Sequence, residues 1–397
     1  MSASDVQLML DGPPLHDPLF HAGDPFPAFR RLRAETGLHW HPTPGFWAVV
    51  RHVDVVAVSR DPGTFCSSRG VLLSDIDRGV MPRQSIIYID PPEHAKYRKL
   101  VQPAFTPGRI RALEGRITAL VRELLDGIED GHTVDFVDAF AATLPIVVIA
   151  DMLGVPGSDR AQFKRWSDAI IDAGTQPTSD NMAQSMELLE YFGTVIAARR
   201  AQPGDDLISV LVHSEIDGER LEEFDLLMFC MTLLVAGNET TRNLLSHGAL
   251  ALATYPNEAA RLRRDPILIA RAVEEMLRWG TPVASFMRIA TRDTELCGTS
   301  IREGDRLILH YASANHDEAV FGPDAEVFRA DRDATSHVAF GFGEHFCLGA
   351  QLARMEGRIA FAHLLEHFRH WEVAGKVERL PSVFIRGIVH LPLVTRR

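Results

Sequence analysis

The stretch HVAFGFGEHFCLGAQLARME (residues 337–356) sets one cysteine, Cys347, among three glycines and directly before a segment with helical spacing. A free cysteine is most often a small hydrophobe that is buried for packing alone. Here, however, Gly341, Gly343 and Gly349 allow the backbone to turn tightly and to approach a ligand. Helical periodicity starts at the cysteine, and unpaired N–H groups at a helix start favour a thiolate over a thiol. The pattern therefore predicts a metal-ligating sulfur at the start of a helix.

The composition of the chain favours one large domain over residues 1–397. The chain has 397 residues, of which 46% are hydrophobic, and this is enough to fill a sizeable core. It contains no internal repeat and no low-complexity linker. The formal charge of −12 argues against nucleic acid as the main partner.

The spacing of the cysteines and the length of the apolar runs indicate the cellular location of the protein. Cys66, Cys230, Cys297 and Cys347 lie far apart without a CxxC spacing, which argues against a zinc site or a disulfide framework and favours the cytoplasm. The opening MSASDVQLMLDGPP is polar, so we expect no signal peptide. The longest apolar run, residues 226–237, is shorter than the ~20 residues that a membrane-spanning helix needs. We therefore expect no membrane anchor.

Hydrophobic periodicity predicts a mainly α-helical fold with small β-sheets. Apolar residues recur at spacings of three and four from Arg109 onward, and one such segment, residues 221 to about 253, predicts a long helix that crosses the core. Alternating, strand-like pieces occur at 37–42, 45–52 and 293–311. Residues 173–181, AGTQPTSDN, are predicted to form a loop between two helices.

Two short motifs admit a structural and a functional interpretation. In VAGNETTR, residues 235–242, one glycine and two threonines interrupt good helix formers, and the stretch includes the polar residues Glu239 and Thr240. Glu239 and Thr240 either cap or bend the helix, or their carboxyl and hydroxyl groups take part in proton transfer. In EEMLRW, Glu275 and Arg278 lie on one helix face, where such a pair is by itself an ordinary structural ion pair.

The cysteine stretch resembles the haem-binding loop FGxGxHxCxG of bacterial cytochromes P450, and other motifs of that family follow in the same order over most of the chain. The matching residues are Phe340, Gly341, Gly343, His345, Cys347 and Gly349. The resemblance implies a single P450 domain in which haem b, iron protoporphyrin IX, lies between the long central helix and the helix that follows the cysteine. It also implies that Cys347 is the proximal ligand, whose electron donation favours O–O cleavage, and that Phe340 shields the sulfur.

The same resemblance assigns the central motif to the oxygen site, because it matches AGx(D/E)TT. Ala236 and Gly237 would leave room for O2, and Thr240 would hydrogen-bond dioxygen or an adjacent water. Glu239 would pass protons inward. The family more often has aspartate at this position, and glutamate keeps the carboxylate on a longer arm.

Further matches concern the haem propionates and the fold. Four residues would neutralise the two carboxylates, namely His94 and Arg98 of an HxxxR motif, Arg288 on a strand, and His345. Glu275 and Arg278 match the family's ExxR pair, which Arg332 would join in a buried structural network.

The implied activity is that of a monooxygenase that inserts one oxygen atom from O2 into a C–H bond of a hydrophobic molecule. The chain has no flavin or Fe–S motif, so electrons are expected from a ferredoxin with its NAD(P)H-ferredoxin reductase, or from a flavodoxin. Basic residues near the expected docking face are Lys96, Arg98, Lys99, Arg109, Arg111 and Arg354.

Substrate-lining segments of the family correspond to residues 71–87, 233–238, 283–286 and 382–387, with Val235, Val283, Phe286 and Phe384 as the predicted contacts. The apolar lining suits a lipid-like molecule. The stretches SIIYIDPPEH, LLVAGNETTRN and FIRGIVHLP resemble the bacterial P450 branch that hydroxylates steroid side chains, terpenoids, and alkyl or fatty acyl chains, which implies a substrate of this kind. The alternatives are a P450 that tailors macrolides or other polyketides, a peroxygenase, and a non-enzymatic haem sensor or carrier. Glu239 and Thr240 argue against the last two, because peroxygenases of this kind normally replace this pair and because proton delivery serves no purpose in simple haem binding.

Overall fold

The computed structural model describes residues 12–78, 85–175, 178–216 and 218–397. Its helices are α2 (Pro18–Ala22), α3 (Phe26–Ala34), α4 (His52–Arg60), α5 (Asp75–Arg78), α6 (Glu93–Val101), α7 (Pro107–Ala112), α8 (Glu114–Asp126), α9 (Thr143–Leu153), α10 (Arg160–Thr175), α11 (Ser179–Ala201), α12 (Leu207–His213), α13 (Glu223–Thr254), α14 (Pro256–Arg264), α15 (Ile269–Gly280), α16 (Tyr311–Ala314), α17 (Glu318–Phe321) and α18 (Ala350–His367).

The strands are short. They are β1 (His39–His41), β2 (Phe46–Val49), β3 (Phe65–Cys66), β4 (Thr133–Asp135), β5 (Glu215–Ile216), β6 (Glu219–Arg220), β7 (Ser285–Ala290), β8 (Thr294–Leu296), β9 (Thr299–Ile301), β10 (Arg306–His310), β11 (His370–Val373), β12 (Glu378–Arg379), β13 (Ile388–His390) and β14 (Pro392–Arg396). Short helical turns that matter for the site are η1 (Ile86–Tyr88) and η6 (Gly343–His345).

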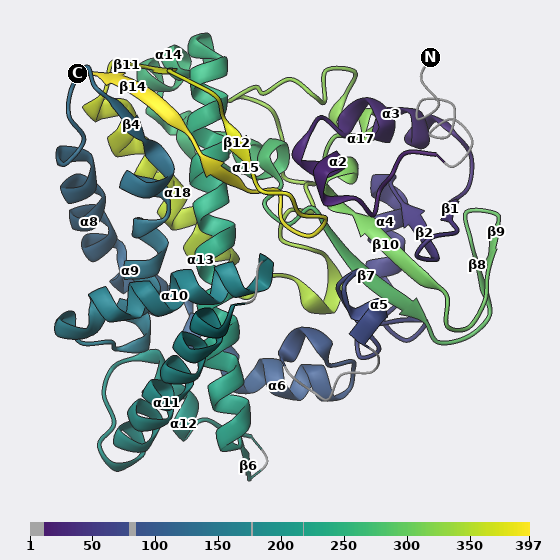
Figure 1. The fold of residues 1–397 in the computed structure, drawn as a ribbon, viewed down its shortest axis with the longest axis horizontal. Helices are drawn as coiled ribbons and strands as arrows, with labels where there is room; N and C mark the ends of the chain where they lie inside the picture. Colours follow the sequence, from purple (N-terminus) through teal and green to yellow (C-terminus); the bar gives the residue numbers. More distant parts are fainter. Residues whose placement is uncertain (1–11, 79–84, 176–177, 217) are drawn as a thin grey trace.

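The helices gather around α13, which runs through the helix-rich side of the molecule (Figure 1). It packs against α9, α15, α18 and α11. At Gly248 the approach to α18 is so close that a Cβ atom would lie 2.2 Å from Cζ of Phe361, so this crossing requires glycine. None of the described helices, α13 included, is long and apolar enough to cross a bilayer.

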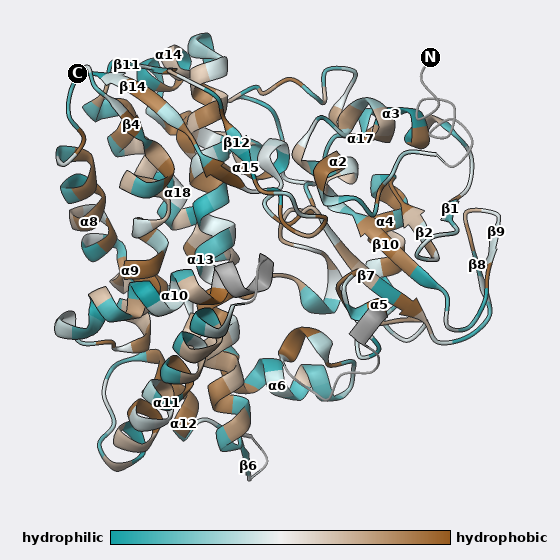
Figure 2. Cartoon of the chain, in the orientation of Figure 1, coloured by the Kyte–Doolittle hydropathy of each residue, from teal (hydrophilic) through white to brown (hydrophobic). Residues whose placement is uncertain are grey.

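A five-stranded sheet forms the other side of the molecule, with strand order β1-β2-β10-β7-β3. Hydrophobic residues occupy β10 and β7 (Figure 2). Side chains alternate across β10, so that Leu307 and Leu309 pack with Val55 and Val58 of α4, while Ile308 packs with Phe29 of α3. The sheet is therefore buried on both faces, and β7 is held firmly at its position near the site.

The element boundaries test the sequence-based expectations. The central helix was expected from 221 to about 253 and runs over Glu223–Thr254. The loop expected at 173–181 is much shorter, because α10 continues to Thr175 and α11 already begins at Ser179. Residues 176 and 177 lie outside the described residues. Thr178 explains the early start of α11, since its side chain caps the helix by accepting a hydrogen bond from the N–H of Asn181.

Candidate active site

The cysteine loop depends on glycines at two positions. Gly341 and Gly343 have φ angles of 71° and 74°, a region that L side chains rarely adopt. A Cβ atom at Gly343 would also lie 2.3 Å from the carbonyl oxygen of Ser59 on α4. The loop closes where the N–H of Cys347 donates to the carbonyl of Phe340 at 2.9 Å. These constraints hold the cysteine in place three residues before α18.

Cys347 is an exposed residue of the protein chain, but the protein atoms packed around its sulfur desolvate the thiol. This burial raises the pKa of Cys347, while hydrogen bonds from the N–H groups of Gly349 and Ala350 act in the opposite direction. The N–H groups at the helix start thus favour the thiolate as expected, but desolvation is the larger effect in the protein chain alone. A cation bound to the sulfur would supply the missing stabilisation of the thiolate.

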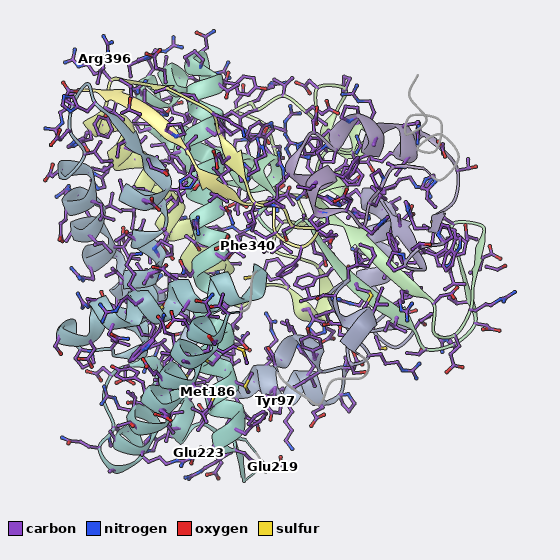
Figure 3. All side chains as sticks on the ribbon, in the orientation of Figure 1. Tyr97, Met186, Glu219, Glu223, Phe340 and Arg396 are labelled. Carbon is purple, nitrogen blue, oxygen red and sulfur yellow. The ribbon has the colours of Figure 1, made fainter. Side chains whose placement is uncertain are left out.

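Phe340 lies in the middle of the molecule (Figure 3). Its ring meets Phe346 edge-on, with centroids 6.2 Å apart. The guanidinium of Arg354 lies 4.6 Å from the centre of the Phe340 ring and is itself held by Glu274 at 2.7 and 2.8 Å. Phe340 is thus fixed from two sides next to the cysteine loop.

Four basic residues from three elements converge near η6. His94 and Arg98 come from α6, Arg288 from β7 and His345 from η6. The rings of His94 and His345 are 4.3 Å apart. Burial is the largest cause that lowers the pKa of His345 to about 3, and the neighbouring charges that add to it are Arg288, His94 and Arg98. The structure therefore brings all four predicted residues together.

This basic cluster has spare hydrogen-bonding capacity. Nδ1 of His94 is buried and has no hydrogen-bond partner among the described residues, and the nearest carboxylate oxygen that pairs with it, on Glu344, is 3.6 Å away. Ser67, which the sequence did not suggest, places its hydroxyl 3.2 Å from Nε2 of His345. Such a set suits anionic groups that are enclosed by protein.

The middle of α13 combines accessible and buried positions. Val235 is 37% exposed although its helix neighbour Leu234 is buried, and Ala236 is exposed as well. At Gly237 a Cβ atom would lie 2.8 Å from Cδ1 of Ile149. The hydroxyl of Thr240 donates to the carbonyl of Ala236 at 2.6 Å, so its lone pairs are left to accept from a ligand or water.

Glu239 points into a different environment from Thr240. Its side chain is buried, and Oε1 accepts a hydrogen bond from Nδ2 of Asn243 at 2.9 Å. Oε2 has no hydrogen-bond partner within the described chain and lies 3.6 Å from Nη1 of Arg242. Asn243 in turn accepts from the N–H of Ile388 at 3.0 Å, which ties the carboxylate to β13. The sequence reasoning missed Asn243, although its position one turn after Glu239 is a detectable pattern.

Glu275, Arg278 and Arg332 form one buried network. The side chains of Glu275 and Arg278 are both 0% exposed and are joined by hydrogen bonds of 2.6 and 2.8 Å. Arg332 reaches the same carboxylate at 3.1 Å. Arg278 also donates to the carbonyls of Asn315 and Ala325, at 2.7 Å each. The network therefore fixes α15 to the segment between α17 and the cysteine loop.

Three of the four predicted substrate contacts lie together. The rings of Phe286 and Phe384 have centroids 5.2 Å apart, and Val283 forms a β-bridge with Ile385 beside them. Val283, Phe286 and Phe384 are each partly accessible, in contrast to most of their neighbours. Within the predicted segment 71–87, positions 79–84 lie outside the described residues.

The six predicted basic residues are not equally free to bind a partner. Lys96 forms an ion pair with Glu219, and Arg354 is paired with Glu274. Arg98 instead lines a surface hollow of about 360 Å³ beside the cysteine loop, together with Ser59, Arg60, Pro62, Gly343 and Glu344.

Comparison with known proteins decides the family. The family model "Cytochrome P450" matches residues 267–392. "Cytochrome P450 109" of Bacillus spizizenii is 40% identical over 382 residues, which cover 93% of this chain and 91% of the relative. The chain belongs to the cytochrome P450 family.

Solved P450 structures share the fold. CYP109E1 from Bacillus megaterium in complex with testosterone has 35% sequence identity and a TM-score of 0.85, with 94% of this chain and 99% of that chain covered. PksS, the P450 of the bacillaene polyketide synthase of Bacillus subtilis 168, has 37% identity and a TM-score of 0.87, with 96% and 99% covered. The predicted P450 fold, with many helices and small sheets, is thereby confirmed.

As a P450 monooxygenase, the protein binds haem, uses O2 and a redox partner, and acts on hydrophobic molecules. The residues fit this cofactor. Cys347 is an exposed residue in a glycine loop, and a basic cluster, in which a buried His94 nitrogen lacks a hydrogen-bond partner within the described chain, is available for two propionates. When bound, haem supplies the redox chemistry that activates O2.

Proposed function

We propose that this P450 hydroxylates a steroid or terpenoid, or an alkyl or fatty acyl chain, at an unactivated C–H bond. The observation that carries the proposal is the likeness, over nearly the whole chain, to a P450 solved with testosterone. The partly accessible apolar side chains of Val283, Phe286 and Phe384 support it, because burying a rigid apolar skeleton against them contributes roughly 25 cal/mol per Å².

In this proposal Cys347 ligates the haem iron. His94, Arg98, Arg288 and His345 hold the propionates. Thr240 positions the proton that dioxygen receives, because its hydroxyl oxygen can accept from a water while its own proton is engaged by Ala236. Glu239 passes protons inward to Thr240, and Asn243 keeps the Glu239 carboxylate oriented by donating a hydrogen bond to it.

The proposed electron donor is an acidic ferredoxin with its NAD(P)H-dependent reductase, or a flavodoxin. The hollow beside the cysteine loop presents Arg60 and Arg98 at its wall and favours an acidic surface. We also propose a cytoplasmic location, since all four cysteines are free thiols.

A polyketide-tailoring function is the second candidate, because PksS is as similar in fold as CYP109E1. Titration of the purified holoenzyme with testosterone, linalool, a long-chain fatty acid and a macrolide distinguishes the two. We expect a saturable shift of the Soret band with testosterone or linalool, followed by hydroxylated product when a ferredoxin system is added. A shift with the macrolide alone would favour the polyketide candidate.

The proposed role of Thr240 predicts uncoupling in Thr240→Ala. Product per NADH consumed should fall by roughly 100-fold, the lower end of what a positioned proton donor contributes, while NADH consumption and peroxide formation continue. Thr240→Ser keeps the hydroxyl and should retain most of the coupling. If Thr240→Ala remains as tightly coupled as Thr240→Ser, Thr240 does not position the proton.

A further inference from the structure

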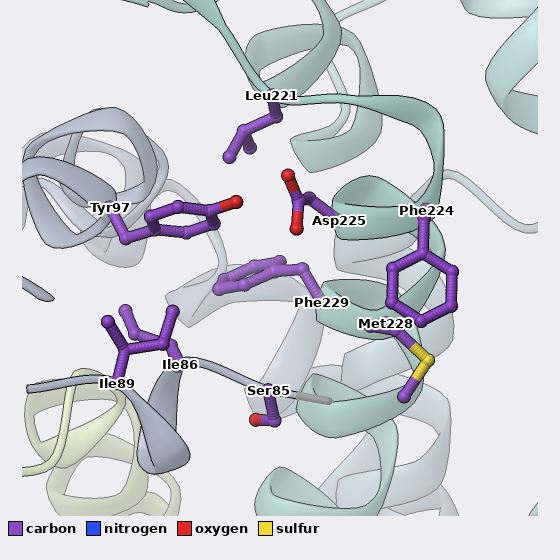
Figure 4. A pocket seen from close by; sticks show the side chains of 9 residues that line it. All are labelled: Ser85, Ile86, Ile89, Tyr97, Leu221, Phe224, Asp225, Met228 and Phe229. Carbon is purple, nitrogen blue, oxygen red and sulfur yellow. The ribbon is translucent and has the colours of Figure 1, made fainter. Parts of the chain in front are cut away.

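The crevice at the N-terminal end of α13 is too small to be a second ligand site. Its lining includes Ile86, Phe224 and Met228 (Figure 4). Its volume of about 20 Å³ is enough for a single water molecule. A more extensive arrangement surrounds Phe340, where the carboxylate of Glu274 binds two side chains that contact the cysteine loop.

The first of these side chains is Arg354 of α18. Oε1 of Glu274, on α15, accepts from Nε of Arg354 at 2.7 Å, and Oε2 accepts from Nη2 at 2.8 Å. Two such parallel bonds are the strong geometry for a guanidinium and a carboxylate. The same guanidinium lies over the Phe340 ring, 4.6 Å from its centre, which is within the range of cation–π attraction. Glu274 therefore fixes the cation that covers the Phe340 ring.

The second side chain is that of His337, which is buried. Its Nδ1 accepts from the N–H of Ala339 at 3.1 Å, so the ring proton lies on Nε2. Nε2 then donates to Oε2 of Glu274, also at 3.1 Å. The residue directly before Phe340 is thereby held by the same carboxylate that holds Arg354.

Both contacts lead to the residue that closes the cysteine loop. The carbonyl of Phe340 accepts from the N–H of Cys347 at 2.9 Å, so the position of Phe340 and the position of the sulfur depend on one another. Burial by itself would raise the pKa of Glu274, but hydrogen bonds from His337 and Arg354 outweigh it and lower the pKa to about 2. Glu274 is therefore charged at neutral pH and balances the charge of Arg354.

We propose that Glu274 is a positioning residue that sets the reduction potential of the haem iron, because it holds Arg354 and Phe340 beside Cys347 and balances the arginine charge. The inference rests on the proposed ligation of haem by Cys347. Reduction of ferric to ferrous haem takes up one electron, so an unbalanced cation nearby favours the ferrous form and an unbalanced anion opposes it. The side chains of Glu274 and Arg354 are only 17% and 30% exposed, so water and salt screen this effect incompletely.

Equilibrium titration of the purified holoenzyme with dithionite and dye mediators, followed at the Soret band, measures the potential without a protein partner. Glu274→Gln keeps the shape of the side chain and removes its charge. At a fixed potential the ratio of ferrous to ferric haem should rise roughly tenfold in this variant, a shift of about 59 mV.

The arginine provides the opposite test. Arg354→Met removes the cation and leaves the Glu274 carboxylate unbalanced, so the midpoint potential should shift in the other direction. The double variant Glu274→Gln/Arg354→Met removes both charges, and its midpoint should return close to that of the unmodified protein. This cycle separates the balance of the two charges from the effect of either substitution alone.

Glu318→Gln is the matched control, because Glu318 also binds one arginine through both of its oxygens. It accepts from Arg33 at 3.1 and 3.0 Å, but it joins α17 to α3 and does not contact the cysteine loop. Its midpoint potential should equal that of the unmodified protein.

Two results would overturn the proposal. One is a midpoint in Glu274→Gln that equals that of Glu318→Gln, and the other is a double variant that keeps the full shift of Glu274→Gln. If Glu274→Gln does not load haem, Arg354→Met decides alone, and an unchanged midpoint in it overturns the proposal. Absence of the thiolate carbon monoxide band from the unmodified holoenzyme would instead refute the haem site at Cys347.

Discussion

Cys347→Ala is expected to abolish the carbon monoxide absorption band that is typical of thiolate-ligated haem, and to reduce product formation to background. Alanine has no donor atom, so the iron would lose the ligand whose electron donation drives O–O cleavage. Cys347 is an exposed residue, and the loop is held by its glycines and by the Cys347 backbone N–H, which alanine retains. The chain should therefore fold around the altered site.

The matched control is Cys230→Ala, which removes a thiol that is completely buried in α13. Burial raises the pKa of Cys230 to about 12, so this thiol stays protonated and is unsuited to ligation. We expect the carbon monoxide band to persist in Cys230→Ala. An unchanged band in Cys347→Ala would instead show that another residue holds the iron.

The long-range periodicities of the sequence predicted the fold well. The central helix differs from its expected limits by two residues at the start and one at the end, because burial on most sides imposes an almost continuous apolar pattern. The expected strand pieces appear as β1, β2, β8, β9 and β10. The length of the loop at 173–181 was overestimated, because Gly and Pro in this segment were given more weight than the helix-capping residue Thr178.

The sequence predicted residues of the candidate active site only at positions that belong to a family motif. His94, Arg288 and His345 lie far apart in the sequence, and only folding brings them together. The link from Asn243 to Ile388 spans 145 residues and has no local pattern. The helix start beside Cys347 is visible in the sequence, whereas the desolvation that raises the pKa of its thiol is not.

Glu275→Ala is expected to cost ~3 to 5 kcal/mol in the free energy of unfolding, because it leaves two guanidinium groups buried without their carboxylate. Arg278 is 0% exposed and cannot turn toward water, and Arg332 keeps only its bonds to Asp324 and to backbone carbonyls. The same carboxylate accepts from the N–H of Arg329, so the chain leading to the cysteine loop loses an anchor as well. Haem loading should fall together with stability.

Denaturant unfolding of the purified variants measures this cost, with Glu215→Ala as the matched control. Glu215 also pairs with an arginine, Arg220, but the two side chains are 44% and 61% exposed. Solvent already screens that pair, so its loss should cost about 1 kcal/mol or less. Each variant removes one carboxylate, but Glu275 is buried and holds both Arg278 and Arg332, whereas Glu215 is exposed and holds Arg220. Equal midpoints for Glu275→Ala and Glu215→Ala would mean that the buried network does not stabilise the fold.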